Sequence, residues 1–318
     1  MAEALAPRLE EFEAAARLAE GVLAPTALVP FDEGTGAVSL KVELDQPTGS
    51  FKPRGVFHAV ARMDPRARAR GISTVSAGNT AKALAWAGSR FGVAARSLMP
   101  VGAPRTKIEA VRELGGTPVL VERDELFRFL REAGWEDEPY AFVHPWTDRD
   151  VLVGHGTLGL EIAEQAPDVE TVFVPVGGGG LLGGVGSALR AALGGVRLVA
   201  VEPAGCPSLS AALAAGEPVE VGCETICDGV AVPAIAAAAL PLLARLTDEV
   251  VVVEEEEVRA AIRALAEEAG LIVEGAGALA LAAARRVGAA GRGRAVCLVT
   301  GGAIDEELLE EILGVGRA

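Results

Sequence analysis

The chain has 318 residues, of which 50% are hydrophobic and 23% charged, and its formal net charge is −15 at pH 7. This size and balance are typical of a globular protein with one large or two medium α/β domains. The acidity disfavours nucleic acid and an anionic membrane surface as partners, and no charge-free apolar run is long enough to span a membrane.

Apolar periodicity predicts the elements in chain order. Leu9, Phe12, Ala16 and Ala19 recur at helical spacing before Gly21, and alternation over residues 39–44 predicts a strand. Helices are then expected over 80–91 and 104–114, and strands over 72–75, 94–99, 117–121, 171–176, 197–201, 250–253 and 295–299. Near-continuous apolar strands that alternate with helices indicate mainly parallel sheets covered by helices on both faces, an α/β fold.

One lysine stands in a turn suited to covalent chemistry. Lys52 follows Phe51 and the turn residues Pro47 and Gly49, shortly after the strand expected at 39–44. A lysine amine forms a Schiff base with a carbonyl group, and desolvation beside an aromatic ring favours its neutral, nucleophilic form. A lysine after a turn is more often a solvated charge, so this interpretation depends on the motifs that follow.

A second motif joins the strand at 72–75 to the helix at 80–91. It consists of Ser76, Ala77, Gly78, Asn79 and Thr80. Small residues at a helix start leave backbone N–H groups free to bind an anion. Ser76 and Asn79 are also ordinary helix-capping residues, so the motif alone does not decide between the two roles.

A third motif is a run of four glycines, Gly177, Gly178, Gly179 and Gly180, which leads into a helix near Leu181. Glycines permit positive φ and let successive N–H groups turn inward as a nest for phosphate. The spacing is not the G-x-G-x-x-G pattern of a dinucleotide site. A nucleotide-binding module without catalysis would explain the glycines but not Lys52.

The four cysteines are scattered, and so are the three histidines. Cys206, Cys223, Cys227 and Cys297 are too few for a disulfide framework, and no second Cys/His pair completes a zinc site. Buried free thiols in a reducing cytoplasm are therefore expected. The glutamate-rich N-terminus lacks the basic and apolar regions of a secretory signal.

Together these motifs resemble the pyridoxal-phosphate enzymes of fold type II, the tryptophan synthase β type, along nearly the whole chain. The stretch from Gln46 to Lys52, followed by Arg54 and Gly55, is most similar to the serine/threonine dehydratases. The resemblance implies pyridoxal 5′-phosphate as the cofactor. It also implies that Lys52 is the catalytic residue and holds the cofactor covalently, beside Phe51.

The other motifs take their roles from the same resemblance. Ser76, Ala77, Gly78, Asn79 and Thr80 would bind the substrate carboxylate, with Asn79 also on the ring hydroxyl of the cofactor. Gly177, Gly178, Gly179, Gly180 and Leu181 would hold its phosphate, Thr300 its ring nitrogen, and Glu274 would lie near the ring. Related enzymes begin a divalent metal site at the place of Glu202, but Ser208 stands where they have an acidic partner, so no such metal is expected.

The resemblance further implies two α/β domains, each with a mainly parallel, helix-covered sheet, and a cofactor in the cleft between them. Residues 1–48 and 146–318 would form the larger, cofactor-binding domain. Residues 49–145 would form a smaller, mobile domain that carries the carboxylate loop.

The implied activity converts a small amino acid, L-threonine or L-serine, to a 2-oxo acid and ammonia, in a cytoplasmic homodimer or homotetramer. Two alternatives share the fold. A β-replacement synthase, such as a threonine or cysteine synthase, would share Thr80 but usually has aspartate in place of Pro53. An amino-acid racemase would use a serine at position 77, whereas Ala77 has no proton to give.

Overall fold

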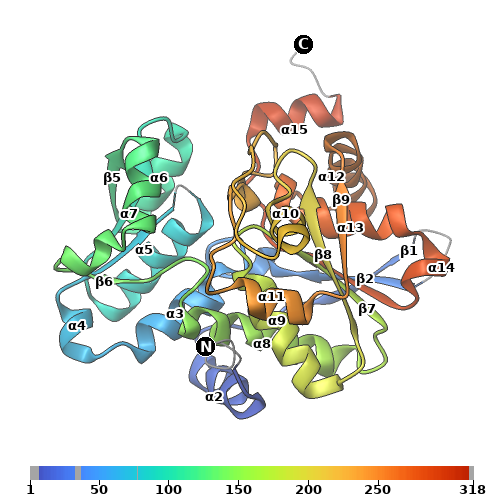
Figure 1. The fold of residues 1–318 in the computed structure, drawn as a ribbon, viewed down its shortest axis with the longest axis horizontal. Coiled ribbons are helices and arrows are strands. Elements are labelled where there is room, and N and C mark those ends of the chain that lie inside the picture. The colour runs from blue at the N-terminus through green and yellow to red at the C-terminus, as the bar shows by residue number, and fades with distance from the viewer. Residues whose placement is uncertain (1–6, 33–36, 77, 315–318) are drawn as a thin grey trace.

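The computed structural model describes residues 7–32, 37–76 and 78–314 and contains two β-sheets (Figure 1). The larger sheet has the strand order β1-β2-β10-β7-β8-β9, and the smaller has the order β5-β4-β3-β6. The strands are β1 (Leu28–Asp32), β2 (Ala37–Val42), β3 (Ile72–Val75), β4 (Ala95–Pro100), β5 (Thr117–Val121), β6 (Ala141–Phe142), β7 (Thr171–Pro175), β8 (Arg197–Pro203), β9 (Glu249–Val253) and β10 (Ala295–Val299).

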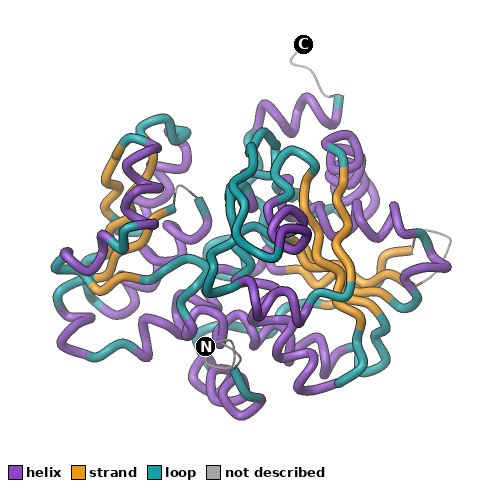
Figure 2. Tube along the Cα trace, in the orientation of Figure 1, coloured by secondary structure: helices purple, strands orange, loops and turns teal. Residues whose placement is uncertain are grey.

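Among the described strands, every pairing except that of β1 with β2 is parallel. In the larger sheet, Ala295 of β10 lies opposite Val38 of β2 on one side and Thr171 of β7 on the other. The carboxyl ends of β2, β7 and β10 therefore meet at one edge, where ligands of open α/β sheets bind. The predicted α/β class with parallel, helix-covered sheets is confirmed (Figure 2).

Helices surround both sheets (Figure 1). They are α2 (Leu9–Ala19), α3 (Lys52–Arg62), α4 (Pro65–Ala69), α5 (Asn79–Phe91), α6 (Arg105–Glu113), α7 (Arg123–Arg131), α8 (Arg149–Gln165), α9 (Gly180–Leu193), α10 (Ser208–Ala215), α11 (Leu240–Leu246), α12 (Glu255–Ala269), α13 (Gly275–Val287), α14 (Ala289–Arg292) and α15 (Glu306–Leu313). Within the ranges described, none of these helices has the length and apolar character needed to cross a bilayer.

The larger sheet buries a different row of side chains on each face. Phe173 of β7 belongs to the same hydrophobic cluster as Ile262 of α12 and Leu279 of α13. Its neighbours Val172 and Val174 belong to the cluster formed with α8 and α9. Successive strand residues point to opposite faces, so both faces are covered and the strand ends are held in a rigid three-layer core.

Helix α3 lies unusually close to α8. A Cβ atom added to Gly154 of α8 would lie 2.3 Å from the carbonyl oxygen of Arg54 in α3. Only glycine allows two backbones to approach so closely. Because α3 begins at Lys52, this contact fixes the lysine relative to the larger sheet.

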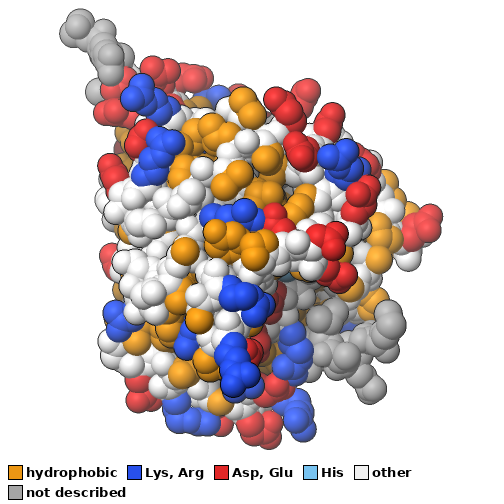
Figure 3. Space-filling model, turned by 90° about the vertical axis from the view of Figure 1, so that its left-hand side faces the viewer, with side chains coloured by type: hydrophobic (Ala, Val, Ile, Leu, Met, Phe, Trp, Pro, Cys, Tyr) orange, Lys and Arg blue, Asp and Glu red, His pale blue; other side chains and the backbone are white. Residues whose placement is uncertain are grey.

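Charged side chains of both signs are interspersed on the face that carries the smaller sheet (Figure 3). No single sign of charge gathers over this face, although the chain as a whole has a net charge of −15. The negative balance is therefore a property of the whole composition rather than of this surface.

The structure corrects two local expectations. The strand expected over 39–44 ends at Val42, and Glu43–Asp45 forms a 3-10 helix, η1, because Gln46 N donates back to Glu43 O at 3.4 Å. The expectation of four free thiols was wrong, because Cys206 and Cys223 form a disulfide, whereas Cys227 and Cys297 are free and buried. A loop folds back on the segment after β8, where Glu224 N donates to Gly205 O at 3.0 Å, and this pairing brings the two neighbouring cysteines together.

Candidate active site

Lys52 is the first residue of α3, and its turn is hydrogen-bonded to the end of β10. Phe51 N donates to Thr300 O at 3.0 Å, and Gly302 N donates to Gly49 O at 3.1 Å. Ser50 and Gly301 form an isolated antiparallel bridge between these two bonds. The lysine turn and the turn that follows β10 at Gly301 and Gly302, called here the C-terminal turn, therefore form one unit.

The surroundings of Lys52 favour its neutral amine. Burial lowers the pKa of Lys52 to about 8, although the negative charge of Glu274 acts in the opposite direction. Its Nζ lies 4.6 Å from the centroid of the Phe51 ring. Behind that ring lies His155, whose ring centroid is 4.8 Å away. Burial and the charges of Lys52 and Arg54 lower the pKa of His155 well below its ordinary value, so the ring adds no positive charge.

Arg54 anchors the first turn of α3 in a buried ionic network. Its Nε donates to Glu43 Oε2 at 2.6 Å, and its Nη1 donates to Glu161 Oε1 at 2.6 Å. Lys41 completes the network through its own 2.6 Å bond to Glu161. Burial opposes the charge of Arg54, but the two glutamates more than offset this and raise its pKa. The network joins η1, α3 and α8, and it holds the backbone two residues from Lys52.

The predicted carboxylate loop lies at the start of α5. Ser76 N donates to Leu98 O of β4 at 3.0 Å, and Gly78 N donates to Ser76 Oγ at 3.2 Å. Asn79 is the first residue of the helix, and Thr80 is buried in its first turn. Ala77, which the sequence also assigns to this loop, lies outside the described residues.

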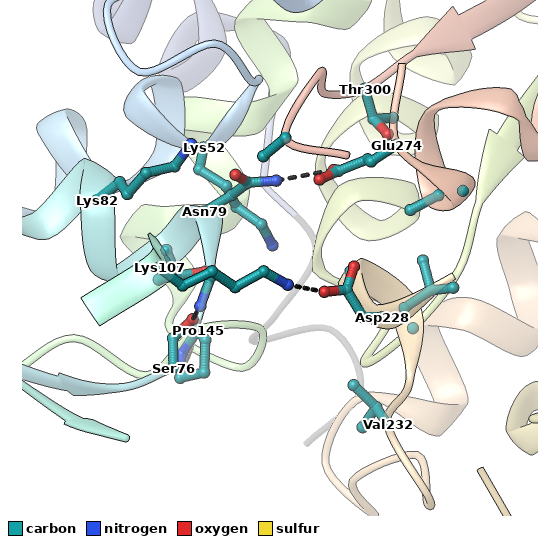
Figure 4. Close-up of a pocket in the computed structure, with 18 of the residues that line it drawn as sticks. Lys52, Ser76, Asn79, Lys82, Lys107, Pro145, Asp228, Val232, Glu274 and Thr300 are labelled. Carbon is teal, nitrogen blue, oxygen red and sulfur yellow. Dashed lines mark hydrogen bonds and ion pairs between the residues drawn. The ribbon is translucent and has the colours of Figure 1, made fainter. Parts of the chain in front are cut away.

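Asn79 faces Glu274 across the site (Figure 4). Its Nδ2 donates to Glu274 Oε1 at 2.8 Å, while its Oδ1 is buried without a hydrogen-bond partner among the described residues. Glu274 precedes α13 and is tied to the C-terminal turn, because its N donates to Gly301 O at 3.1 Å. Burial raises the pKa of the Glu274 carboxyl, against the opposing charges of Lys82, Lys107 and Lys52 and the bond from Asn79.

The four glycines form the turn from β7 into α9. Gly179 has a φ of +86°, a conformation that favours glycine. A Cβ atom on Gly178 would lie 2.3 Å from the Trp146 side chain, so a larger residue there would displace the indole or the turn. The glycines therefore allow a compact backbone turn, the glycine cradle, that packs against Trp146 and leads into the start of α9. A glycine turn at the start of a helix is an arrangement that binds phosphate.

One cavity of about 700 Å³ unites these motifs. It is lined by every described residue that the sequence assigns to the site, namely Phe51, Lys52, Ser76, Gly78, Asn79, Thr80, Gly177, Gly178, Gly179, Gly180, Leu181, Glu274 and Thr300. Segments far apart in the chain thus converge at the carboxyl ends of β3, β7 and β10.

Sequence reasoning missed several lining residues, above all Lys82, Lys107 and Asp228. Lys107 of α6 forms an ion pair with Asp228, which lies on the other side of the cavity (Figure 4). One signal was available, because lysine is rare in this chain. Only four of its 29 basic residues are lysines, and three of those line the cavity.

The Glu202 carboxylate accepts hydrogen bonds from other residues of the protein. Its Oε1 accepts from Leu209 N at 2.6 Å, and its Oε2 accepts from Ser210 N at 2.9 Å and Ser210 Oγ at 2.8 Å. The carboxylate therefore caps the start of α10. Across the described ranges, no group of three or more Cys, His, Asp or Glu side chains is placed to hold a metal ion.

The cavity residues fit pyridoxal 5′-phosphate. Lys52 offers an amine whose pKa of about 8 suits bond formation with an aldehyde. The glycine cradle lines the same cavity at the start of α9, where the N–H groups of a first helical turn bind a phosphate. The unpaired, buried Oδ1 of Asn79 requires a hydrogen-bond donor, which a ring hydroxyl would supply.

The fold has two mainly parallel sheets, and a buried lysine, a glycine cradle and a polar loop meet in one cavity at the carboxyl ends of their strands. This arrangement is typical of an enzyme that holds a cofactor covalently. The family model for pyridoxal-phosphate-dependent enzymes matches residues 20–301. The chain belongs to this family, as the motif resemblance predicts.

Individual relatives agree with the family. An L-threonine ammonia-lyase of Thermotoga maritima is 38% identical over 317 residues, which are 97% of this chain and 78% of that protein. The structure of maize serine racemase superposes with a TM-score of 0.88 at 27% identity and covers 98% of both chains. A threonine deaminase isoform 2 from Solanum lycopersicum gives 0.86 at 29% identity and covers 99% of this chain and 96% of its own.

Proposed function

We propose that this enzyme removes water from L-threonine or L-serine and releases a 2-oxo acid and ammonia. The observation that carries the proposal is the Lys52 amine, with its pKa lowered to about 8, in one cavity with the starts of α5 and α9. The relatives named L-threonine ammonia-lyase and threonine deaminase support this choice of substrate. Pyridoxal 5′-phosphate, when bound, supplies the electron-withdrawing system that makes the substrate Cα proton acidic.

Lys52 has two tasks in this proposal. Its amine would hold the cofactor, and its Nζ would take the proton from Cα of the bound substrate. With a pKa of about 8, roughly a tenth of the amine is neutral at pH 7, whereas an ordinary lysine would be about a thousandth neutral or less. The C–O bond at Cβ then breaks, water leaves, and the released enamine reacts with water to give the 2-oxo acid and ammonia.

The other residues bind and orient. We assign the substrate carboxylate to the loop of Ser76, Gly78 and Thr80, where the first turn of α5 favours an anion through its N–H groups and its dipole. The phosphate belongs to the glycine cradle at the start of α9. Asn79 would hold the ring hydroxyl, and Glu274 orients Asn79 through the 2.8 Å bond. Thr300 would hold the ring nitrogen.

The proposal extends to the domains and the assembly. Residues 49–145, which contain the smaller sheet, would form the mobile domain, and residues 1–48 and 146–318 the larger one. Closure of the smaller domain would bring the carboxylate loop onto the substrate. We also propose that the enzyme forms a homodimer or homotetramer in the cytoplasm.

We propose elimination rather than racemisation, which is the activity named for the maize structure. Racemisation needs an acid on the opposite face of Cα from Lys52. Position 77 carries alanine, whose methyl group donates no proton. Because Ala77 lies outside the described residues, this preference rests on its residue type.

The test is an assay of the purified holoenzyme with L-threonine and L-serine. We expect a 2-oxo acid and ammonia in a one-to-one ratio, and no turnover by the Lys52→Ala variant. Arg105→Gln is a suitable control, because Arg105 is exposed on α6 and does not line the cavity. Failure of both amino acids to give a 2-oxo acid would rule the proposal out.

A further inference from the structure

The distribution of lysine in this protein is the starting observation. Of the 29 basic residues, 25 are arginine, and the four lysines are Lys41, Lys52, Lys82 and Lys107. Lys41 lies in the buried ionic network, and the other three line the cavity. A chain that otherwise uses arginine has lysine at these places, where a compact, point-like cation differs most from a planar guanidinium.

Most charges in the cavity already have a partner. Lys107 is ion-paired with Asp228, and Glu274 accepts from Asn79. Asp305 caps α15, because its Oδ1 accepts from Glu307 N at 3.0 Å and Leu308 N at 3.3 Å. Lys52 is reserved for the cofactor in the function proposed above.

Lys82 is the exception. Its side chain is half-buried and lines the cavity, yet its ammonium forms no hydrogen bond or ion pair with any other described residue. Burial lowers the pKa of Lys82, while the negative charge of Glu274, which lines the same cavity but forms no ion pair with Lys82, acts in the opposite direction. A half-buried cation without a partner is costly, so its presence at a ligand cavity points to an anion supplied by the ligand.

This anion would be a third one, in addition to the phosphate of the cofactor and the α-carboxylate of the amino acid. Lys82 follows Asn79 by three residues in α5, so the two side chains share one face of the helix (Figure 4). In the proposed function, the first turn of α5 supplies backbone donors for the α-carboxylate, and the glycine cradle at 177–180 supplies them for the phosphate. Neither of these two sites needs the ammonium of Lys82.

We propose that the amino-acid substrate carries a second anion on its side chain, a carboxylate or a phosphate ester, and that Lys82 binds it. This inference rests on the elimination proposed above and extends its substrates from the neutral threonine and serine to amino acids with an anionic side chain. Lys107 lines the same cavity, but its charge is already balanced by Asp228, so Lys82 is the ammonium that remains for this anion. A neutral side chain, such as that of threonine or serine, would leave Lys82 without its partner.

The elimination reaction is balanced for both candidate substrates. A 3-hydroxyaspartate loses the Cα proton and the Cβ hydroxyl as water, and hydrolysis of the enamine then gives oxaloacetate and ammonia. O-Phosphoserine loses the Cα proton and inorganic phosphate instead of water. Its enamine takes up one water molecule and gives pyruvate and ammonia. No oxidant or reductant is needed in either case.

The kinetic test compares four substrates in four proteins. Holoenzyme, Lys82→Gln, Lys82→Arg and Arg105→Gln are assayed for 2-oxo acid release from L-threonine, L-serine, L-threo-3-hydroxyaspartate and O-phospho-L-serine. We expect the parent to have a higher kcat/KM for one of the two anionic substrates than for the neutral ones, and that substrate identifies the anion as carboxylate or phosphate. Lys82→Gln should lose about 10–100-fold on it, while its kcat/KM for serine changes less than about threefold. Lys82→Arg should recover part of the loss, and Arg105→Gln should match the parent.

A binding measurement separates this inference from the proposed function. Calorimetry measures the affinity of the protein for succinate, which has two carboxylates, and for butanoate, which has one, so the effect of the second carboxylate is obtained without turnover. We expect the parent to bind succinate more tightly than butanoate, and we expect Lys82→Gln to lose this difference. If threonine is converted while succinate shows no advantage and Lys82→Gln slows all substrates equally, the inference is wrong and elimination stands. If no amino acid is converted but the succinate advantage depends on Lys82, elimination is wrong and the anion site stands.

Discussion

Asn79 Nδ2 lies 2.8 Å from Glu274 Oε1, and this hydrogen bond connects the start of α5 to the start of α13 across the cavity. The two helices belong to different sheets, with α5 beside the smaller one and α13 covering the larger one. Glu274 is also the carboxylate that raises the pKa of Lys52 against the effect of burial. One side chain therefore links the carboxylate loop to the electrostatics of the reactive lysine.

The first prediction concerns the pH at which Lys52 reacts. The neutral amine attacks the aldehyde, so the rate of covalent cofactor binding by apoprotein should rise with pH and reach half of its maximum near pH 8. In Glu274→Gln the charge that raises the pKa of Lys52 is gone, and the midpoint should move to lower pH. Stopped-flow absorbance of cofactor binding measures both. A midpoint near 10, the value of an exposed lysine, would show that Lys52 is not desolvated.

The second prediction concerns Gly178. Its added Cβ would lie 2.3 Å from the Trp146 side chain, so Gly178→Ala should distort the cradle at a cost of about 1–3 kcal/mol. We expect weaker cofactor retention during dialysis, and recovery when Trp146→Leu is added. Gly195→Ala is the control, because no atom lies within 4 Å of its added Cβ. Equal retention by Gly178→Ala and the control would argue against the cradle.

Thr300 is buried at the end of β10 and lines the cavity. Thr300→Ala should keep the cofactor, because Lys52 and the glycine cradle remain, and should slow elimination roughly 2–10-fold through one lost hydrogen bond. Thr300→Asp should be slower still, since a carboxylate would stabilise the protonated ring nitrogen, whose positive charge would draw electrons into the ring. Steady-state rates check this. Parent-like rates in both variants would mean that Thr300 does not contact the cofactor.

Arg54 provides a stability test. Arg54→Met removes the main partner of Glu43, which is fully buried, and of Glu161. Breaking such a pair typically costs about 3–5 kcal/mol, because an unpaired buried charge remains. Arg190→Met, which breaks the exposed pair with Asp248, should cost about 0–1 kcal/mol. Denaturant unfolding compares the two, and similar losses would contradict the anchoring role of Arg54.

The strands and the site motifs were predictable for one physical reason. Buried parallel strands are continuous apolar runs, and the turns at their carboxyl ends need special residues, such as Gly49 and Gly179, that local sequence displays. The expected strands at 117–121 and 295–299 match β5 and β10 residue for residue.

Other features depend on contacts between distant segments and have no local signature. The disulfide of Cys206 and Cys223 requires that one loop fold back beside β8. The ionic network of Arg54 joins residues separated by up to 120 positions. The sequence around Lys82 has no feature that shows that this side of α5 lines the cavity. The functional reading of Lys82 needed the fold and the arginine-rich composition together.

The central claim is that Lys52, and neither of the other two lysines of the cavity, holds the cofactor. Borohydride reduction of the holoenzyme followed by peptide mass mapping tests it directly, because the chain offers only four lysines to label. The account predicts a reduced cofactor adduct on the peptide that contains Lys52 and none on those with Lys82 or Lys107. An adduct on Lys82 or Lys107, or none on a cofactor-saturated protein, would contradict it.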